Sequence, residues 1–204
     1  MTFPEIRPAR EDELTTVGAL ISYSFDELAA DAYLVPVEAD RLRVMADFFT
    51  LLTEHAYQYG RVDVIDAPPG SEEAYAAAAV WFDMTQEAPG PERYEERLEE
   101  LAGEYLPRFQ ALDELFEKNH PTDPHWHLAF LAVHPSHQSH GLGSLLMTDV
   151  HEELDASGTP AYLEATNPNN IRLYKRHGYT EMEPFEILLP DGTPFSRMWR
   201  PAAA

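Results

Sequence analysis

The segment from Leu128 to Leu146 restricts the fold of this chain more than any other part of its sequence. It opens with a run of apolar residues that ends at Val133 and has the length of a buried strand. A turn containing Gly141 and Gly143 follows, and an amphipathic helix begins directly after it. A strand that enters a glycine turn and then a helix is a unit of mixed α/β sheets, so we expect that fold class.

Strands and helices alternate along the whole chain, which favours one mixed sheet flanked by helices. The alanine-rich range 74–82 is interpreted as a buried strand, although a helix is also possible there. The charged stretch 91–119 keeps helical spacing of its apolar residues around Pro107, which predicts two helices that meet at this proline. The expected strands are 3–8, 61–65, 74–82, 125–133, 160–165, 179–188 and 195–200, and the other expected helices are 10–21, 37–57, 141–156 and 168–177.

Length, composition and charge exclude several classes of protein. A chain of 204 residues, of which 44% are hydrophobic, is expected to form one domain around one core. The absence of cysteine excludes disulfides, thiolate metal clusters and a cysteine nucleophile. The N-terminus does not resemble a signal peptide and no long apolar segment occurs, so we expect a soluble, cytoplasmic monomer or homodimer. A net charge of −22 repels nucleic acid and anionic membranes, and neither is an expected partner.

The glycine turn has the properties of an anion-binding site. The first N–H groups of a helix lack partners within the helix, and the positive end of the helix dipole lies beside them. Gly141 and Gly143 allow the backbone to approach a diphosphate because no Cβ intrudes. The sequence matches neither the dinucleotide-binding pattern G-x-G-x-x-G nor the Walker pattern. Most acidic side chains precede His120, so an anionic cofactor is expected in the less acidic second half.

Two motifs together resemble the GNAT superfamily of acetyl-CoA-dependent N-acetyltransferases. The phosphate loop of the family follows the pattern Gln/Arg-x-x-Gly-x-Gly/Ala. In this sequence the pattern is matched by Gln138, Gly141 and Gly143. The range 162–179 resembles the second cofactor motif, a strand, an Asn-bearing turn and a helix that ends in Tyr-x-x-x-Gly-Tyr. Detailed similarity runs from Trp126 to the C-terminus and is greatest to the puromycin N-acetyltransferase group.

The resemblance implies a sheet of about seven strands and transfer of an acetyl group to the amine of a small molecule. Transfer would be direct, in a ternary complex. Residues 1–124 would form the substrate side, with the helical insertion 91–119, and residues 125–204 the acetyl-CoA side. The alternatives are acetylation of a protein N-terminus or lysine, which the insertion would hinder, and a non-catalytic acyl-CoA-binding module.

The same resemblance implies a set of cofactor contacts. Ser139 and His140 replace the glycine and the basic residue of many relatives, so phosphate binding should depend more on backbone amides and the helix dipole. Affinity for the cofactor should therefore be modest, or should rise when His140 is protonated. The expected contacts are Leu131, Ala132, Val133, Gln138, Ser139, His140, Gly141, Leu142, Gly143, Ser144, Asn167 and Asn170.

Three residues are candidates for proton transfer. Tyr174 occupies the position of the family's tyrosine, whose hydroxyl can protonate the departing thiolate. His127 matches the position of the catalytic glutamate in the histone-acetylating branch, and an imidazole can act as a base near neutrality. Glu164, on the neighbouring strand, is the rival base, since burial would raise its pKa.

The remaining candidates concern metal and substrate. His134, His137 and His140 repeat every third residue, and His125 and His127 form an H-x-H pair. No acidic or cysteine partner has ligand spacing, so we expect no metal. Substrate contacts are expected from aromatic residues of the first two helices and the 74–82 strand: Tyr23, Phe25, Tyr33, Phe49 and Trp81.

Overall fold

The computed structural model describes residues 4–203 and contains one seven-stranded mixed sheet in the order β1-β2-β3-β4-β5-β7-β6. Only β4 and β5 pair in parallel, and the other neighbours are antiparallel. The predicted fold class is confirmed, and the alanine-rich range is a strand. The strands are β1 (Ile6–Pro8), β2 (Gly60–Asp66), β3 (Tyr75–Met84), β4 (His125–Val133), β5 (Ala161–Ala165), β6 (Thr180–Leu188) and β7 (Pro194–Arg200). Residue 3, the predicted start of the first strand, lies outside the described residues.

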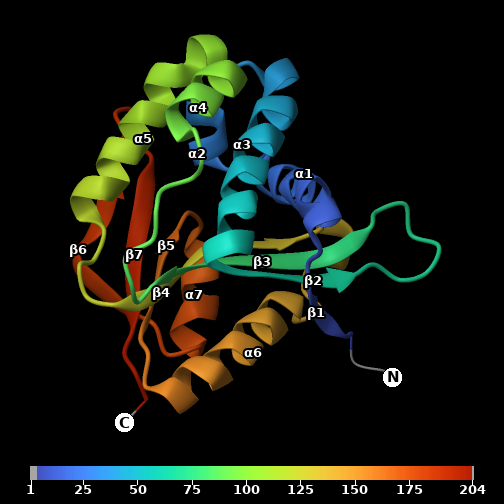
Figure 1. Ribbon diagram of the computed structural model, residues 1–204, viewed down its shortest axis with the longest axis vertical. Coiled ribbons are helices and arrows are strands. Elements are labelled where there is room, and N and C mark those ends of the chain that lie inside the picture. The colour runs from blue at the N-terminus through green and yellow to red at the C-terminus, as the bar shows by residue number, and fades with distance from the viewer. Residues whose placement is uncertain (1–3, 204) are drawn as a thin grey trace.

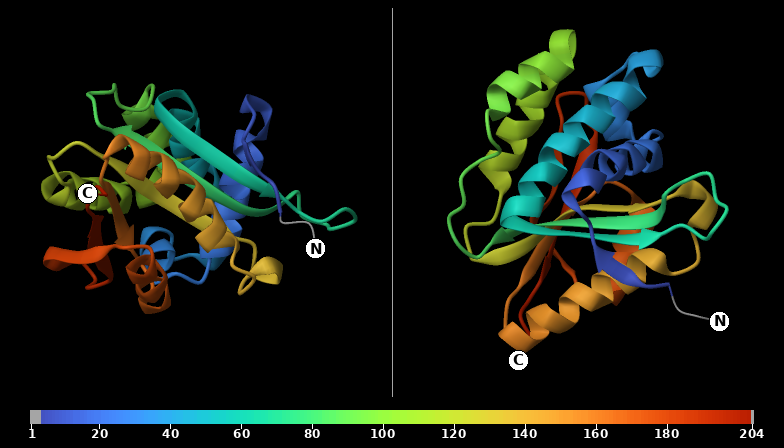
Figure 2. Two further views of the ribbon diagram at one scale, coloured as in Figure 1. Left: turned by 90° about the horizontal axis from the view of Figure 1, so that it is seen from below. Right: turned by 45° about the vertical axis from the view of Figure 1, so that its right-hand side comes forward.

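Helices cover both faces of this twisted sheet (Figure 1). Helices α1 and α3 pack together on one face, and α6 lies across the other (Figure 2). They are α1 (Leu14–Phe25), α2 (Ala29–Leu34), α3 (Glu38–Tyr59), α4 (Tyr94–Ala102), α5 (Leu106–Asn119), α6 (Leu142–Ser157) and α7 (Pro168–Arg176). Among residues 4–203, no helix has both the length and the apolar character needed to span a membrane.

Two details of the helices differ from the sequence prediction. Helix α2 was not predicted, because its six residues are too few to show helical periodicity. The break in the 91–119 insertion lies at Gly103–Tyr105, a 3₁₀ turn, and not at Pro107. Pro107 instead occupies the first turn of α5, where its missing N–H has no helical acceptor to lose.

The sheet opens between β4 and β5. These strands pair only at Trp126 with Ala161 and His127 with Tyr162, although β4 continues to Val133. A bulge accompanies the opening, since the register against β3 shifts and leaves Ala129 as an extra residue of β4. Past His127, the β4 edge that faces β5 is therefore free of strand partners among the described residues, and a gap forms at the centre of the molecule.

Candidate active site

A groove of about 710 Å³ runs from the N-terminus of α6 to α7. Its floor includes Leu131 and Val133 at the free edge of β4. The size falls within the range of small-molecule and cofactor sites. Of the predicted cofactor contacts, the groove is lined by Leu131, Val133, Gln138, Ser139, Gly141, Leu142, Gly143, Ser144, Asn167 and Asn170.

The turn before α6 presents free amides to this groove. Gly141 is the N-cap residue, with φ 81°, and has no side chain to cap the helix. No atom within residues 4–203 accepts a hydrogen bond from the N–H of Leu142, Gly143 or Ser144. Three unpartnered N–H groups beside the positive helix end fit a diphosphate. The structure thus has the anion-binding geometry that the sequence predicted.

Helix α7 closes the other side of the groove. Asn167 is its N-cap, and its Oδ1 accepts a hydrogen bond of 2.8 Å from the Asn169 N–H. Asn170 and, about two turns further on, Arg176 also line the groove. Sequence reasoning missed Arg176, although its spacing from Asn169 and Leu173 places the three on one helical face. Arg176 supplies a positive charge that the turn itself lacks.

Two of the predicted cofactor contacts, Ala132 and His140, do not line the groove, and a third, Ser144, lines it with a hydroxyl that already has a protein partner. Ala132 is fully buried and belongs to the core under α1 and α3, because alternate strand residues face opposite sides of the sheet. His140 does not line the groove and bonds through Nδ1 to the carbonyl of His137 at 3.2 Å. The hydroxyl of Ser144 lies 2.6 Å from Nε2 of His177, so its side chain is already engaged.

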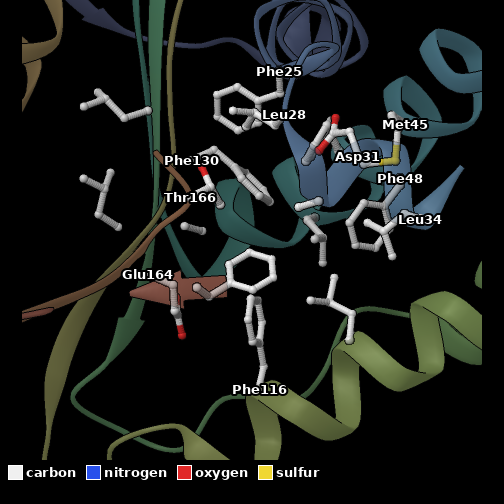
Figure 3. A pocket seen from close by; sticks show the side chains of 18 of the residues that line it. Phe25, Leu28, Asp31, Leu34, Met45, Phe48, Phe116, Phe130, Glu164 and Thr166 are labelled. Carbon is white, nitrogen blue, oxygen red and sulfur yellow. The ribbon is translucent and has the colours of Figure 1, made fainter. Parts of the chain in front are cut away.

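A second, mostly apolar cavity of about 240 Å³ lies between β4, β5 and the helices α1, α2, α3 and α5 (Figure 3). Phenylalanine rings make up much of its wall: Phe25, Phe48, Phe49, Phe82, Phe116, Phe130 and Phe195. Four residues line both this cavity and the groove, namely Phe25, Leu28, Leu131 and Asn170. The two spaces therefore meet beside the gap between β4 and β5.

His127 and Glu164 are hydrogen-bonded to each other in the wall of this cavity. Nε2 of His127 lies 2.8 Å from Oε2 of Glu164, and the other carboxylate oxygen, Oε1, is buried without a partner among the described residues. Burial acts to raise the pKa of Glu164, but the charge of His127 and its hydrogen bond outweigh burial and lower it. The expected rise in this pKa was therefore wrong, and the two rival bases are partners.

Tyr174 belongs to α7 and lines the apolar cavity. Only 7% of its surface is exposed. Burial alone, and no hydrogen bond from another described residue, acts on its hydroxyl. Burial raises the pKa of Tyr174 well above its ordinary value, so the hydroxyl keeps its proton at neutral pH. Such a group can donate a proton but is a poor base.

Of the predicted substrate contacts, Phe25 and Phe49 line the cavity, and the other three do not. Tyr23 is exposed and stacks on His134 at 5.1 Å. The ring of Tyr33 packs against Arg108. Trp81 is fully buried in the core on the α6 side of the sheet, because strand alternation turns it away from the cavity.

Acidic residues that sequence reasoning missed also line the cavity. Asp31 of α2 is 4% exposed, and Asp113 of α5 accepts hydrogen bonds of 3.0 Å on both oxygens from the hydroxyl of Tyr94. Burial raises the pKa of Asp113 to about 6. An acidic residue on an amphipathic helix is ordinarily solvent-facing, so the sequence contained no signal for either residue.

The histidines that repeat in the sequence do not form one cluster in the structure. His134 and His137 lie beside Glu73, a residue of the β2–β3 connection, with possible ligand atoms within 4.8 Å of one another. Glu73 hydrogen-bonds to Ser136 and His137, which explains the arrangement by protein contacts. His140 does not belong to this group. His125 instead bonds through Nδ1 to the carbonyl of Asp123 at 2.6 Å.

A groove with free amides at a helix N-terminus, a split between two parallel strands and an adjoining apolar cavity suit the transfer of an acyl group from a phosphate-bearing carrier. Residues 81–179 match the model of the acetyltransferase (GNAT) family. The chain has the fold of the GNAT acetyltransferases and is an acyltransferase whose cofactor is acetyl-CoA.

Solved structures have the same architecture. One is a Corynebacterium glutamicum protein described as histone acetyltransferase HPA2 and related acetyltransferase, with 26% identity, a TM-score of 0.69 and coverage of 100% of this chain and 98% of that one. Arylalkylamine N-acetyltransferase 2 from Aedes aegypti has 12% identity, a TM-score of 0.63 and coverage of 98% and 99%. PaiA N-acetyltransferase from Thermoplasma acidophilum, in complex with coenzyme A, has 12% identity, a TM-score of 0.59 and coverage of 98% and 99%. At these identities the last two show the fold alone.

Proposed function

We propose that this enzyme transfers the acetyl group of acetyl-CoA directly to a primary amine of a small molecule within a ternary complex. The observation that carries the proposal is the aromatic cavity of about 240 Å³ that meets the cofactor groove at Leu131 and Asn170. An amine in the cavity and a thioester in the groove would meet beside the gap between β4 and β5. No covalent enzyme intermediate is needed in such an arrangement.

The groove would hold acetyl-CoA mainly through backbone groups. The free N–H groups of Leu142, Gly143 and Ser144 would bind the diphosphate, and Arg176 would add a positive charge. The free edge of β4 near Leu131 would hydrogen-bond to the rest of the cofactor. When bound, acetyl-CoA supplies a thioester whose carbon–sulfur bond is exchanged for a carbon–nitrogen bond to the amine.

Glu164 would be the base. An amine is an ammonium ion at neutral pH and must lose a proton before it can attack. Oε1 of Glu164 is buried, unpartnered and in the cavity wall, while His127 holds Oε2 and keeps the carboxylate ionised. Glu164 would take the proton from the ammonium, and His127 would position the carboxylate. Tyr174 would then protonate the departing thiolate.

The walls of the cavity favour a small acceptor over a polypeptide. Side chains of α2, α4 and α5 line this space, and α4 and α5 belong to the insertion 91–119. An extended protein segment would need an open channel across this region. The resemblance of the sequence from Trp126 to the C-terminus to the puromycin N-acetyltransferase group supports the same class of substrate.

The test is release of coenzyme A thiol when the protein is mixed with acetyl-CoA and a panel of aromatic and aliphatic primary amines. A second panel of peptides with free N-termini and lysines serves as the comparison. We expect turnover with at least one small amine and none with peptides. Turnover confined to peptides would contradict the proposal, and tight coenzyme A binding without any turnover would favour a binding module.

A further inference from the structure

Asp31 differs from the other acidic residues of the acceptor cavity, because its buried carboxylate has no hydrogen-bond partner among residues 4–203. The side chain belongs to α2, the residue is 4% exposed, and Oδ2 forms no hydrogen bond within residues 4–203. A buried, unpaired carboxylate costs folding free energy, and proteins ordinarily avoid one. The other carboxylates of the cavity are satisfied, at least in part: Tyr94 bonds to Asp113, and His127 bonds to Glu164.

The charges around Asp31 do not neutralise it. The positive charge of Arg41, on α3, acts on Asp31, but its guanidinium bonds to the carbonyls of Val35 and Asp26 and pairs with the Asp26 carboxylate at 3.9 Å. Burial raises the pKa of Asp31 well above its ordinary value, Arg41 offsets part of that effect, and Asp26 adds to it. Asp113 and Tyr94, on α5 and α4, line the same cavity and add no positive charge.

Asp31 and Glu164 lie on opposite sides of the cavity, with phenylalanine rings between them (Figure 3). Glu164 is next to the gap where the acceptor nitrogen would react. A ligand that reaches from one carboxylate to the other must therefore cross an apolar, aromatic region. Such walls favour a rigid hydrocarbon or aromatic spacer and also attract a cation through ring faces.

We propose that Asp31 is a subsite for a second cationic group of the acceptor, so that the preferred substrates are amines with an apolar spacer and a distal ammonium or similar cation. This inference rests on the proposed acceptor cavity and specifies its substrate class. The ammonium at the distal end would donate a hydrogen bond to Oδ2 of Asp31 and supply the missing charge partner. The proximal amine would face Glu164 and receive the acetyl group.

The experiment compares two amines that differ only at the distal end: 1,4-bis(aminomethyl)benzene and 4-methylbenzylamine. The proteins are the wild type, Asp31→Asn, and the control Glu27→Gln, which removes one acidic charge at an exposed position of the nearby chain that lines neither the cavity nor the groove. Wild type should use the diamine with a kcat/KM roughly 10- to 100-fold above that of the monoamine, the range of a charge-assisted hydrogen bond. This ratio should fall to near the statistical factor of two in Asp31→Asn and persist in Glu27→Gln.

Two further measurements test the Asp31 subsite independently of the proposed acetyl transfer. Binding of each amine to the coenzyme A complex is measured by calorimetry, and thermal stability is measured without ligand. If neither amine is acetylated, the proposed function fails, but tighter binding of the diamine to wild type than to Asp31→Asn would still support the subsite. Equal use and equal binding of both amines by wild type would overturn it. A clearly lower Tm for Asp31→Asn would also overturn it, because Oδ2 of Asp31 forms no hydrogen bond within residues 4–203 that the substitution could remove.

Discussion

Replacement of Glu164 by glutamine tests the catalytic proposal most directly. The two side chains have nearly the same shape, so the hydrogen bond of 2.8 Å to Nε2 of His127 can be kept while the basic oxygen is lost. A general base contributes about 10²- to 10⁴-fold to the rate. At 1.36 kcal/mol for each factor of ten, the barrier should rise by about 2.7 to 5.4 kcal/mol. Affinity for coenzyme A should stay unchanged, because Glu164 does not line the groove.

The assay is steady-state release of coenzyme A thiol with both substrates varied, together with calorimetry of coenzyme A binding. Glu153→Gln is the matched control, since Glu153 is exposed on α6, pairs with Arg61 and lies outside both pockets. A turnover number within a few-fold of wild type for Glu164→Gln would refute the base assignment.

The pH dependence gives a second test of the same assignment. Because the pKa of Glu164 is lowered, this carboxylate is already ionised at neutral pH and loses its function only in acid. The acid limb of kcat should therefore lie below the ordinary glutamate range. A limb near neutrality would move the base role to a group that titrates there, such as an imidazole.

Three other perturbations should have distinct effects. Tyr174→Phe should lower kcat by about 100-fold, the lower bound for a general acid, with coenzyme A affinity unchanged; normal single-turnover rates would remove Tyr174 from the acid role. Gly141→Ala places a side chain at φ 81°, which costs roughly 1 to 2 kcal/mol, and it should weaken coenzyme A binding by about tenfold. The control is Gly158→Ala, at φ 65° beyond the other end of α6, which should lower stability and leave coenzyme A binding unchanged. Hydrogen bonding to Arg7 lowers the pKa of Glu13 from 4.5 to about 2, so Glu13→Gln should cost up to about 3 kcal/mol of unfolding free energy at pH 7. That difference should be present above pH 4.5 and disappear as the pH falls toward 2, and a pH-independent difference in denaturant titrations would contradict it.

The anion-binding turn was predictable because its properties are local. A glycine before a helix, the unpartnered first N–H groups and the strand that leads into the turn are all contiguous from Leu128 to Leu146. The same holds for Asn167 as a helix cap, with Pro168 following it. In such segments the sequence neighbours are also the structural neighbours.

The acceptor cavity depends on register and on which way each side chain points, and these are not local. His127 and Glu164 meet only because Tyr162 lies opposite His127 in the short parallel pairing of β4 and β5. Trp81 was assigned to the wrong face, since a shift of one residue along a strand exchanges the two sides of a sheet. Asp31 escaped prediction because burial of a carboxylate on a short helix depends on elements that are distant in the sequence.

Glu73 accepts hydrogen bonds from Ser136 and His137, and these bonds join the β2–β3 connection to the segment immediately before the anion-binding turn. Ordering the backbone of one flexible residue costs about 1 to 2 kcal/mol. In this enzyme part of that ordering takes place when the chain folds, and it need not be repeated each time a cofactor arrives. The β2–β3 connection would thus keep the turn ordered, and substitutions within it would change the affinity for coenzyme A without any contact with coenzyme A.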